Sequence, residues 1–203
     1  MIDDTYVDFA ALASNEMFDR DYTFRVQRRD SGTIVIAPHG GGIEPGTSEV
    51  AEAIAGTEHS FYAFEGIKAS GNRVLHITGT RFDEPQGLGL VRASRTAVAI
   101  HGEDSEGETI MLGGRNHELL EKVGLSLTSR GFPVQCGTKP GLEGSHVNNI
   151  CNRTDTGEGI QIELSNGLRV TFFESLTRNG RTAPTTRFAE FVAAVREALR
   201  TGQ

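Results

Sequence analysis

The chain has 203 residues, a formal net charge of -7 and 37% hydrophobic residues. This length and composition fit one folded domain with a full hydrophobic core and exclude a disordered chain. The negative charge, together with the lack of any Lys/Arg run that would bind phosphates, excludes nucleic acid as the expected partner.

The opening segment, MIDDTYVDFAALASNEMF, is acidic and lacks both the basic start and the apolar core of a signal peptide. No stretch approaches the roughly 20 apolar residues needed to span a bilayer. We therefore expect cytoplasmic synthesis without a signal peptide, and no membrane partner.

Short β-branched and apolar runs predict the strands. The first, residues 33–37 (TIVIA), ends at Pro38 and leads into the loop HGGGIEPGT. Residues 48–55 follow, with acidic side chains near their start, apolar side chains at helical spacing and Gly56 just beyond, which predicts a helix. Further strands are predicted at residues 60–64, 73–78, 96–100, 109–112, 132–136 and 160–164.

Two later segments have the apolar spacing of helices. Asn116 has the residue type of an N-cap for a helix that Gly131 closes, and residues 188–199 form the clearest amphipathic pattern of the chain. Strands interleaved with helices predict an α/β fold in which helices flank a mixed β-sheet. We expect a single domain over residues 1–203, and a monomer.

The two cysteines, Cys136 and Cys151, are too few for a disulfide framework or a four-cysteine zinc site. We interpret both as small buried hydrophobic residues. The sequence leaves open whether they pair.

The loop after the first strand places His39 and Glu44 on either side of three glycines and Ile43. Five extended residues span ~17 Å, whereas the ligands of one zinc ion lie ~2 Å from it, so a shared metal requires the loop to curl back. Glycine permits such a turn and a close backbone approach. The alternatives are a Gly-rich turn with an incidental His and a solvated Glu, or an anion-binding loop.

His101 ends the strand-like run TAVAIH as His39 ends TIVIAPH. Ligands gather at the carboxyl ends of strands in open α/β sheets, so the two histidines can meet there. Together with Glu44 they give three protein ligands and leave the open fourth position of a catalytic zinc. A hydrogen-bonded core histidine is the alternative for His101.

Glu163 lies in the strand GIQIELS, on the face opposite Ile160, Ile162 and Leu164 and on the same face as Gln161. A zinc hydrolase needs a carboxylate near the metal to take a proton from water and pass it to the leaving amine. Glu163 is our candidate for that role. The alternative is an exposed Glu on a half-buried strand.

The blocks APHGGGIEPGTSEVAEAIAG, YAFEGIK, LHITGTRFDEP, AIHGEDSEG and IQIEL resemble those of the phage and bacterial poly-γ-glutamate hydrolases. The resemblance implies a compact α/β fold similar to zinc carboxypeptidases, one Zn2+ ion, and hydrolysis of the γ-amide bonds of poly-γ-glutamate. By position it implies that His39, Glu44 and His101 are zinc ligands and that Glu163 is the general base.

A poly-γ-glutamate substrate has a carboxylate on every unit, so an acidic protein needs local cations to bind it. Arginine suits this task because it grips carboxylates with two hydrogen bonds. Arg115 and Arg153 lie in polar, loop-like stretches, and Arg81 is a third candidate. For each of them the alternative is a surface charge or a local ion pair.

Two further histidines lie in motif-like surroundings: His76 in LHIT and His146 in GSHVNN. Either can orient a ligand, stabilise an oxyanion, or do neither.

Two other functions compete with the polymer hydrolase: an amidohydrolase of small N-acyl-glutamate or γ-glutamyl compounds, and a non-catalytic zinc-bearing protein associated with phage replication. The small-molecule amidohydrolase would need a closed pocket, and the non-catalytic protein would not need Glu163. If the chain is a phage enzyme, we expect host lysis to release it.

Overall fold

The computed structural model describes residues 4–136 and 141–200, except for the side chain of Cys136. The strands are β1 (Tyr22–Gln27), β2 (Thr33–Gly41), β3 (Ser60–Gly66), β4 (Thr96–Glu103), β5 (Ile110–Gly114), β6 (Val134–Cys136) and β7 (Ile160–Ser165). The α-helices are α1 (Phe9–Ala13), α2 (Thr47–Ala55), α3 (Pro85–Arg92), α4 (His117–Ser129), α5 (Asn166–Thr171) and α6 (Thr186–Arg200). Short 3-10 helices are η1 (Asn72–Leu75), η2 (Ile150–Asn152) and η3 (Gly180–Thr182).

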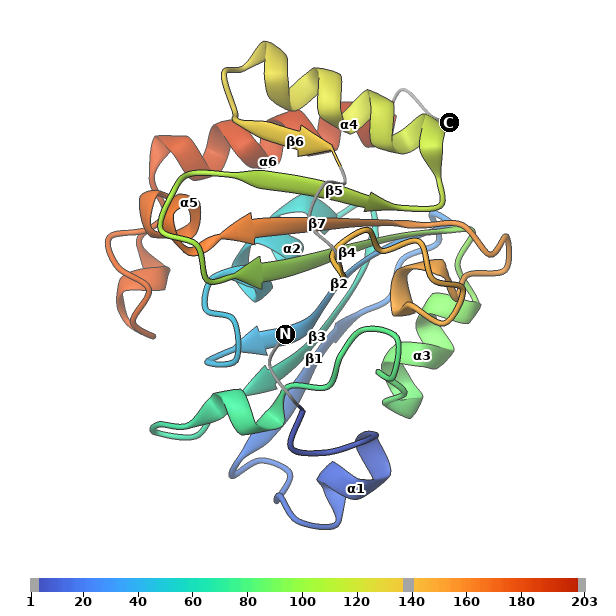
Figure 1. The fold of residues 1–203 in the computed structure, drawn as a ribbon, viewed down its shortest axis with the longest axis vertical. Helices are drawn as coiled ribbons and strands as arrows, with labels where there is room; N and C mark the ends of the chain where they lie inside the picture. The colour runs from blue at the N-terminus through green and yellow to red at the C-terminus, as the bar shows by residue number, and fades with distance from the viewer. Residues whose placement is uncertain (1–3, 137–140, 201–203) are drawn as a thin grey trace.

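The strands form one mixed, seven-stranded sheet in the order β1-β3-β2-β4-β7-β5-β6 (Figure 1). The four central strands β3, β2, β4 and β7 are parallel, whereas β1 and β5 pair antiparallel with β3 and β7. Because β2, β4 and β7 are parallel neighbours, their carboxyl ends lie together at one edge of the sheet.

Helices cover both faces of the sheet. On one face α2, α4 and α6 pack against side chains such as Val35 and Val98, and on the other α1 and α3 enclose a second core that contains Ile34 and Ile36. A central strand that both faces bury is a nearly continuous apolar run, as residues 34–37 of β2 are. The predicted α/β class, with a mixed sheet flanked by helices, is therefore confirmed.

Local signals located three helices correctly. Residues 47–55 form α2, residues 186–200 form α6, and α4 begins after Asn116, whose side chain accepts a hydrogen bond of 3.0 Å from the backbone N–H of Leu119. This bond satisfies one of the free N–H groups at the start of the helix.

The predicted strand at residues 73–78 is wrong. The segment instead forms η1 and an irregular stretch whose Leu75 and Ile77 are buried in the core beside α3. It has no sheet edge to join, because β3 already pairs with β1 on one side and β2 on the other. The sequence patterns also missed β1, α1, α3 and α5, which are short or weakly periodic.

Cys151 is a buried free cysteine, and burial raises the pKa of its thiol to about 12. The predicted burial of Cys136 and its possible pairing lie outside the described part of the chain. Within residues 4–136 and 141–200, no helix has both the length and the apolar composition needed to cross a membrane.

Candidate metal centre and active site

The carboxyl ends of three neighbouring strands carry the candidate site. His39 lies near the end of β2, and His101 on β4 is the direct Cα partner of Glu163 on β7. The register of β2 against β3 shifts between Ala37 and Gly40. Such an irregularity changes the direction in which the neighbouring side chains point, and His39 lies within it.

Three potential ligand atoms converge at this edge. His39 Nδ1 lies 3.1 Å from Glu44 Oε1 and 3.2 Å from His101 Nδ1. The side chains of His39 and His101 are almost wholly buried, and within the described residues these two and Glu44 form the one group of potential metal ligands whose atoms all lie within 4.8 Å of one another.

The chain curls back between His39 and Glu44, as the glycines predict. The backbone N–H of Glu44 donates to the carbonyl of His39 at 2.9 Å, and Gly41 has a φ of +64°. A Cβ atom on Gly41 would lie 2.5 Å from the carbonyl oxygen of Gly66, so the close approach to β3 excludes any larger residue without a backbone shift.

A hydrogen bond to the backbone orients the imidazole of His39. His39 Nε2 donates to the carbonyl of Ile77 at 2.7 Å, because a carbonyl can only accept, and this directs Nδ1 toward Glu44 and His101. His101 Nε2 is buried without a hydrogen-bond partner in the described residues, so the ring makes its polar contact only within this cluster. Two imidazole nitrogens and a carboxylate are a donor set that fits zinc.

The protonation states also suit a metal. Burial raises the pKa of Glu44, but the imidazoles of His39 and His101 outweigh it and hold that pKa at about 2. Burial, followed by the charge of His39, lowers the pKa of His101 to about 3. Burial lowers the pKa of His39, but the Glu44 carboxylate outweighs burial and raises that pKa above its usual value.

Glu163 shares one hollow of about 290 Å³ with all three candidate ligands. We call this the first hollow. Gln161 Nε2 donates to Glu163 Oε1 at 3.0 Å, and Gln161 Oε1 in turn accepts from Asn149 Nδ2 at 2.8 Å. Glu163 is therefore a held, largely buried carboxylate beside the candidate metal centre, and not an exposed surface residue.

His76 packs on His39, with ring centroids 4.0 Å apart. Its Nδ1 lies 2.7 Å from Oδ1 of Asp4, and the other carboxylate oxygen of Asp4 accepts from the backbone N–H of Thr78 and from Arg81. Arg81 is thus an ion-pair partner of Asp4 and does not line the first hollow. His76 lines that hollow, whereas His146 is exposed and outside it.

Two of the predicted substrate-binding arginines lie near the amino ends of β4 and β7, whereas the candidate site lies at the carboxyl ends of these strands. Arg115 follows β5, which runs antiparallel to β7, so its backbone N–H meets the carbonyl of Gly159 just before β7 begins. Arg153 lies two residues before Asp155, whose N–H binds the carbonyl of Ser94 just before β4. The structure therefore does not bring Arg115 or Arg153 to the candidate site.

A different arginine, Arg73, lines the first hollow. Sequence patterns missed it because its segment was interpreted as a strand. Asp4 was also missed, since it contacts His76 across 72 residues, and so was Asn149, which contacts Gln161 from a loop 12 residues earlier. Gln161 had a detectable signal, because it shares a strand face with Glu163 at a spacing of two residues.

The poly-gamma-glutamate hydrolase family matches residues 6–194 of this chain. The chain is 40% identical over 195 residues to the UPF0714 protein YndL of Bacillus subtilis (strain 168), a match that covers 93% of this chain and 75% of YndL. It is 36% identical over 194 residues to the SPbeta prophage-derived UPF0714 protein YoqZ of the same organism, covering 95% of this chain and 70% of YoqZ.

Two solved structures have a closely similar fold. A bacteriophage poly-gamma-glutamate hydrolase matches with a TM-score of 0.96 at 32% identity over 98% of both chains. A zinc-free apo form of YndL matches with a TM-score of 0.93 at 37% identity, covering 98% of this chain and 99% of that chain. The shared fold includes the strand ends that carry the candidate site.

Proposed function

Because this chain belongs to the poly-gamma-glutamate hydrolase family, we propose that it hydrolyses the γ-amide bonds of poly-γ-glutamate with one zinc ion bound by His39, Glu44 and His101. The observation that carries the proposal is the single hollow that holds these three side chains together with the buried carboxylate of Glu163. The zinc-free form of the relative YndL supports zinc as the metal.

In this proposal the metal ion, Glu163 and Gln161 have different roles in the hydrolysis of the amide bond. Zinc, when bound, supplies a Lewis acid that polarises a carbonyl and acidifies water. Glu163 accepts a proton from the attacking water and returns it to the nitrogen of the breaking amide bond, which leaves one new carboxylate and one new amine. The hydrogen bond from Gln161 keeps the Glu163 carboxylate turned toward the reacting groups.

The arrangement favours an enzyme over a zinc-bearing binding protein. A purely structural metal site has no need for a second, separately held carboxylate that faces the same hollow as the ligands. We therefore assign catalysis to this site. Glu163 distinguishes the two functions, because the enzyme needs its carboxylate and a zinc-bearing binding protein does not.

The test is the size distribution of poly-γ-glutamate on gel filtration after incubation with zinc-loaded protein. We expect short fragments from the wild type, none after chelation, and a rate about 10²–10⁴-fold lower for Glu163→Gln, because the proton acceptor is lost. Glu118→Gln is the matched control, since Glu118 pairs with Lys122 on the surface of α4.

Metal content, measured by atomic absorption, separates the possible failures. Glu163→Gln should retain stoichiometric zinc, because Glu163 is not a proposed ligand. A wild type that binds zinc but leaves the polymer length unchanged would refute the polymer substrate and direct the assay to small γ-glutamyl and N-acyl-glutamate amides. Full activity of Glu163→Gln would refute the assignment of the general base.

A further inference from the structure

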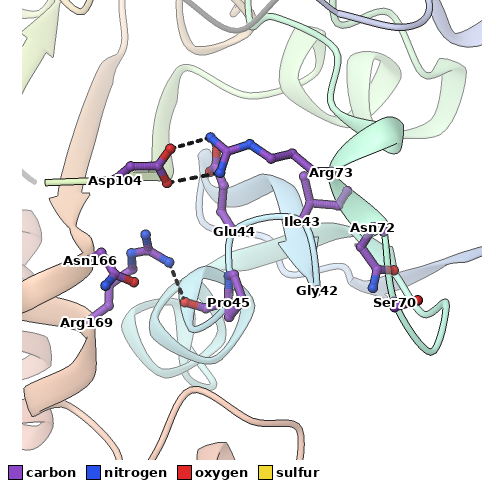
Figure 2. Close-up of a pocket in the computed structure, with 11 residues that line it drawn as sticks. Gly42, Ile43, Glu44, Pro45, Ser70, Asn72, Arg73, Asp104, Asn166 and Arg169 are labelled. Carbon is purple, nitrogen blue, oxygen red and sulfur yellow. Dashed lines mark hydrogen bonds and ion pairs between the residues drawn. The ribbon is translucent and has the colours of Figure 1, made fainter.

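A second hollow of about 430 Å³ adjoins the candidate metal centre. Glu44, Arg73 and Asp104 line both hollows, so the two are continuous along this part of the surface. Figure 2 shows polar side chains around the second hollow, with Asn72 on one side and Asn166 and Arg169 on the other. Nothing in the proposed mechanism accounts for this second space.

Arg169 brings a positive charge to the second hollow, where the carboxylates of Glu44, Glu103 and Asp104 interact with it electrostatically. Its guanidinium is buried and donates to three backbone carbonyls, those of Leu164, Pro45 and Glu103, but forms no ion pair with a carboxylate among the described residues. Burial lowers its pKa, yet an arginine stays protonated at neutral pH. Of the five N–H donors of the guanidinium, the hydrogen bonds described use only three.

Arg73 lies where the two hollows meet, and within the described residues its guanidinium forms one ion pair, which is exposed. Its two terminal nitrogens lie 3.1 Å and 2.6 Å from the two carboxylate oxygens of Asp104, and the two side chains are 49% and 64% exposed (Figure 2). Water reaches both partners of an ion pair this exposed, which weakens their attraction. The guanidinium can therefore release Asp104 and take another carboxylate in the same two-pronged geometry.

We propose that the second hollow is a binding site for a carboxylate of the γ-glutamyl chain. Arg73 exchanges Asp104 for the substrate carboxylate, and Arg169 offers it the N–H donors that its three described hydrogen bonds leave unused. This inference rests on the proposed function, because the ligand class is a γ-glutamyl oligomer, in which every unit carries a free carboxylate. It assigns to Arg73 the substrate-binding role that the sequence suggested for Arg115 and Arg153.

The test compares Arg73→Gln and Asp104→Asn with Arg130→Gln. Arg130 is a matched control, because it forms an exposed ion pair with Glu197 between α4 and α6. Two measurements are made: the KM and kcat for poly-γ-glutamate with zinc-loaded protein, and the anisotropy of a fluorescein-labelled γ-glutamyl tetramer titrated with zinc-free protein. Arg73 is half exposed, so the variant keeps the fold, which circular dichroism verifies.

The two variants should change binding in opposite directions. Arg73→Gln should raise KM and the tetramer Kd by about tenfold with little change in kcat, because a charged hydrogen-bond donor is lost. Asp104→Asn should lower both constants, because the substrate no longer competes with a fixed carboxylate for Arg73. A merely structural ion pair would make both variants change binding in the same direction.

The outcomes separate this inference from the proposed function. Polymer cleavage by the wild type, with KM and Kd of both variants equal to those of Arg130→Gln, would overturn the second site and leave the hydrolase standing. Tetramer binding that depends on Arg73, in a wild type that does not cleave the polymer, would support the carboxylate site and overturn the hydrolase.

Discussion

At the scale of single residues, Gln161 donates a hydrogen bond to the carboxylate on which the proposed chemistry depends. Gln161 and Glu163 project from the same face of β7, because alternate side chains of a strand point to the same side. The amide of Gln161 is fixed at both ends: its Nε2 donates to Glu163 and to the carbonyl of Leu142, and its Oε1 accepts from Asn149. Gln161 is thus a positioning residue.

We predict that Gln161→Met lowers kcat for poly-γ-glutamate by about 10–100-fold while KM stays nearly constant, because loss of an orienting hydrogen bond misplaces the carboxylate without removing substrate contacts. Steady-state kinetics with zinc-loaded protein measures both constants. Gln27→Met is the control, since Gln27 makes a comparable bond to Glu52, which lies in α2. Equal loss in both variants, or a change confined to KM, would contradict the positioning role.

At the scale of elements, the end of β2 determines whether the site can form. The strand continues past Pro38 to Gly41 and then turns back, which places Glu44 beside His39. This turn is possible because Gly41 adopts a positive φ and lies against the backbone of Gly66. Any side chain at position 41 would be strained by the positive φ and would clash with the backbone of Gly66 in β3.

We therefore predict that Gly41→Ala destabilises the fold by about 1–3 kcal/mol, the range for a residue forced into an unfavourable backbone conformation. Gly89→Ala is the matched control: Gly89 lies in α3, and an added Cβ there meets nothing within 4 Å. That substitution should leave stability unchanged or raise it by up to about 1 kcal/mol, because alanine favours the helix. Urea denaturation measures the free energy of unfolding of both variants. An unchanged free energy of unfolding in Gly41→Ala would contradict the steric argument.

At the scale of the whole molecule, the candidate metal centre can form only in the folded chain. His39 and His101 are 62 residues apart in the sequence, and Asp4 reaches His76 across 72 residues. The unfolded chain cannot bring these groups together, so a metal bound by them stabilises the native state alone.

We predict that zinc at about 100 times its Kd raises the melting temperature of the metal-free protein by about 5–10 °C, from a linkage free energy of about 2.7 kcal/mol. Magnesium should have no such effect, because it prefers oxygen ligands. His101→Asn should abolish the zinc shift, whereas His117→Asn should retain it, because His117 is exposed at the start of α4. Differential scanning calorimetry gives the shift, and an equal shift in both variants would place the zinc elsewhere.

The amino-acid sequence by itself determined the features that depend on neighbours along the chain. The apolar periods of α2, α4 and α6 and the apolar run at residues 34–37 of β2 are local patterns, and the α/β class follows from their alternation. Glycines between His39 and Glu44 indicated a sharp turn because only a few residue types allow one. Histidines at two strand ends were expected to meet because parallel strands end at a common edge.

Only the tertiary structure decided which cations reach that edge. Arg115 looked suitable in its loop, but the antiparallel direction of β5 places it at the far ends of β4 and β7. Arg73 looked like part of a strand, but both edges of β3 were already paired, so its segment turned toward the candidate metal centre. Strand direction and pairing are long-range choices made by the packed sheet, and no local pattern in the sequence encodes them.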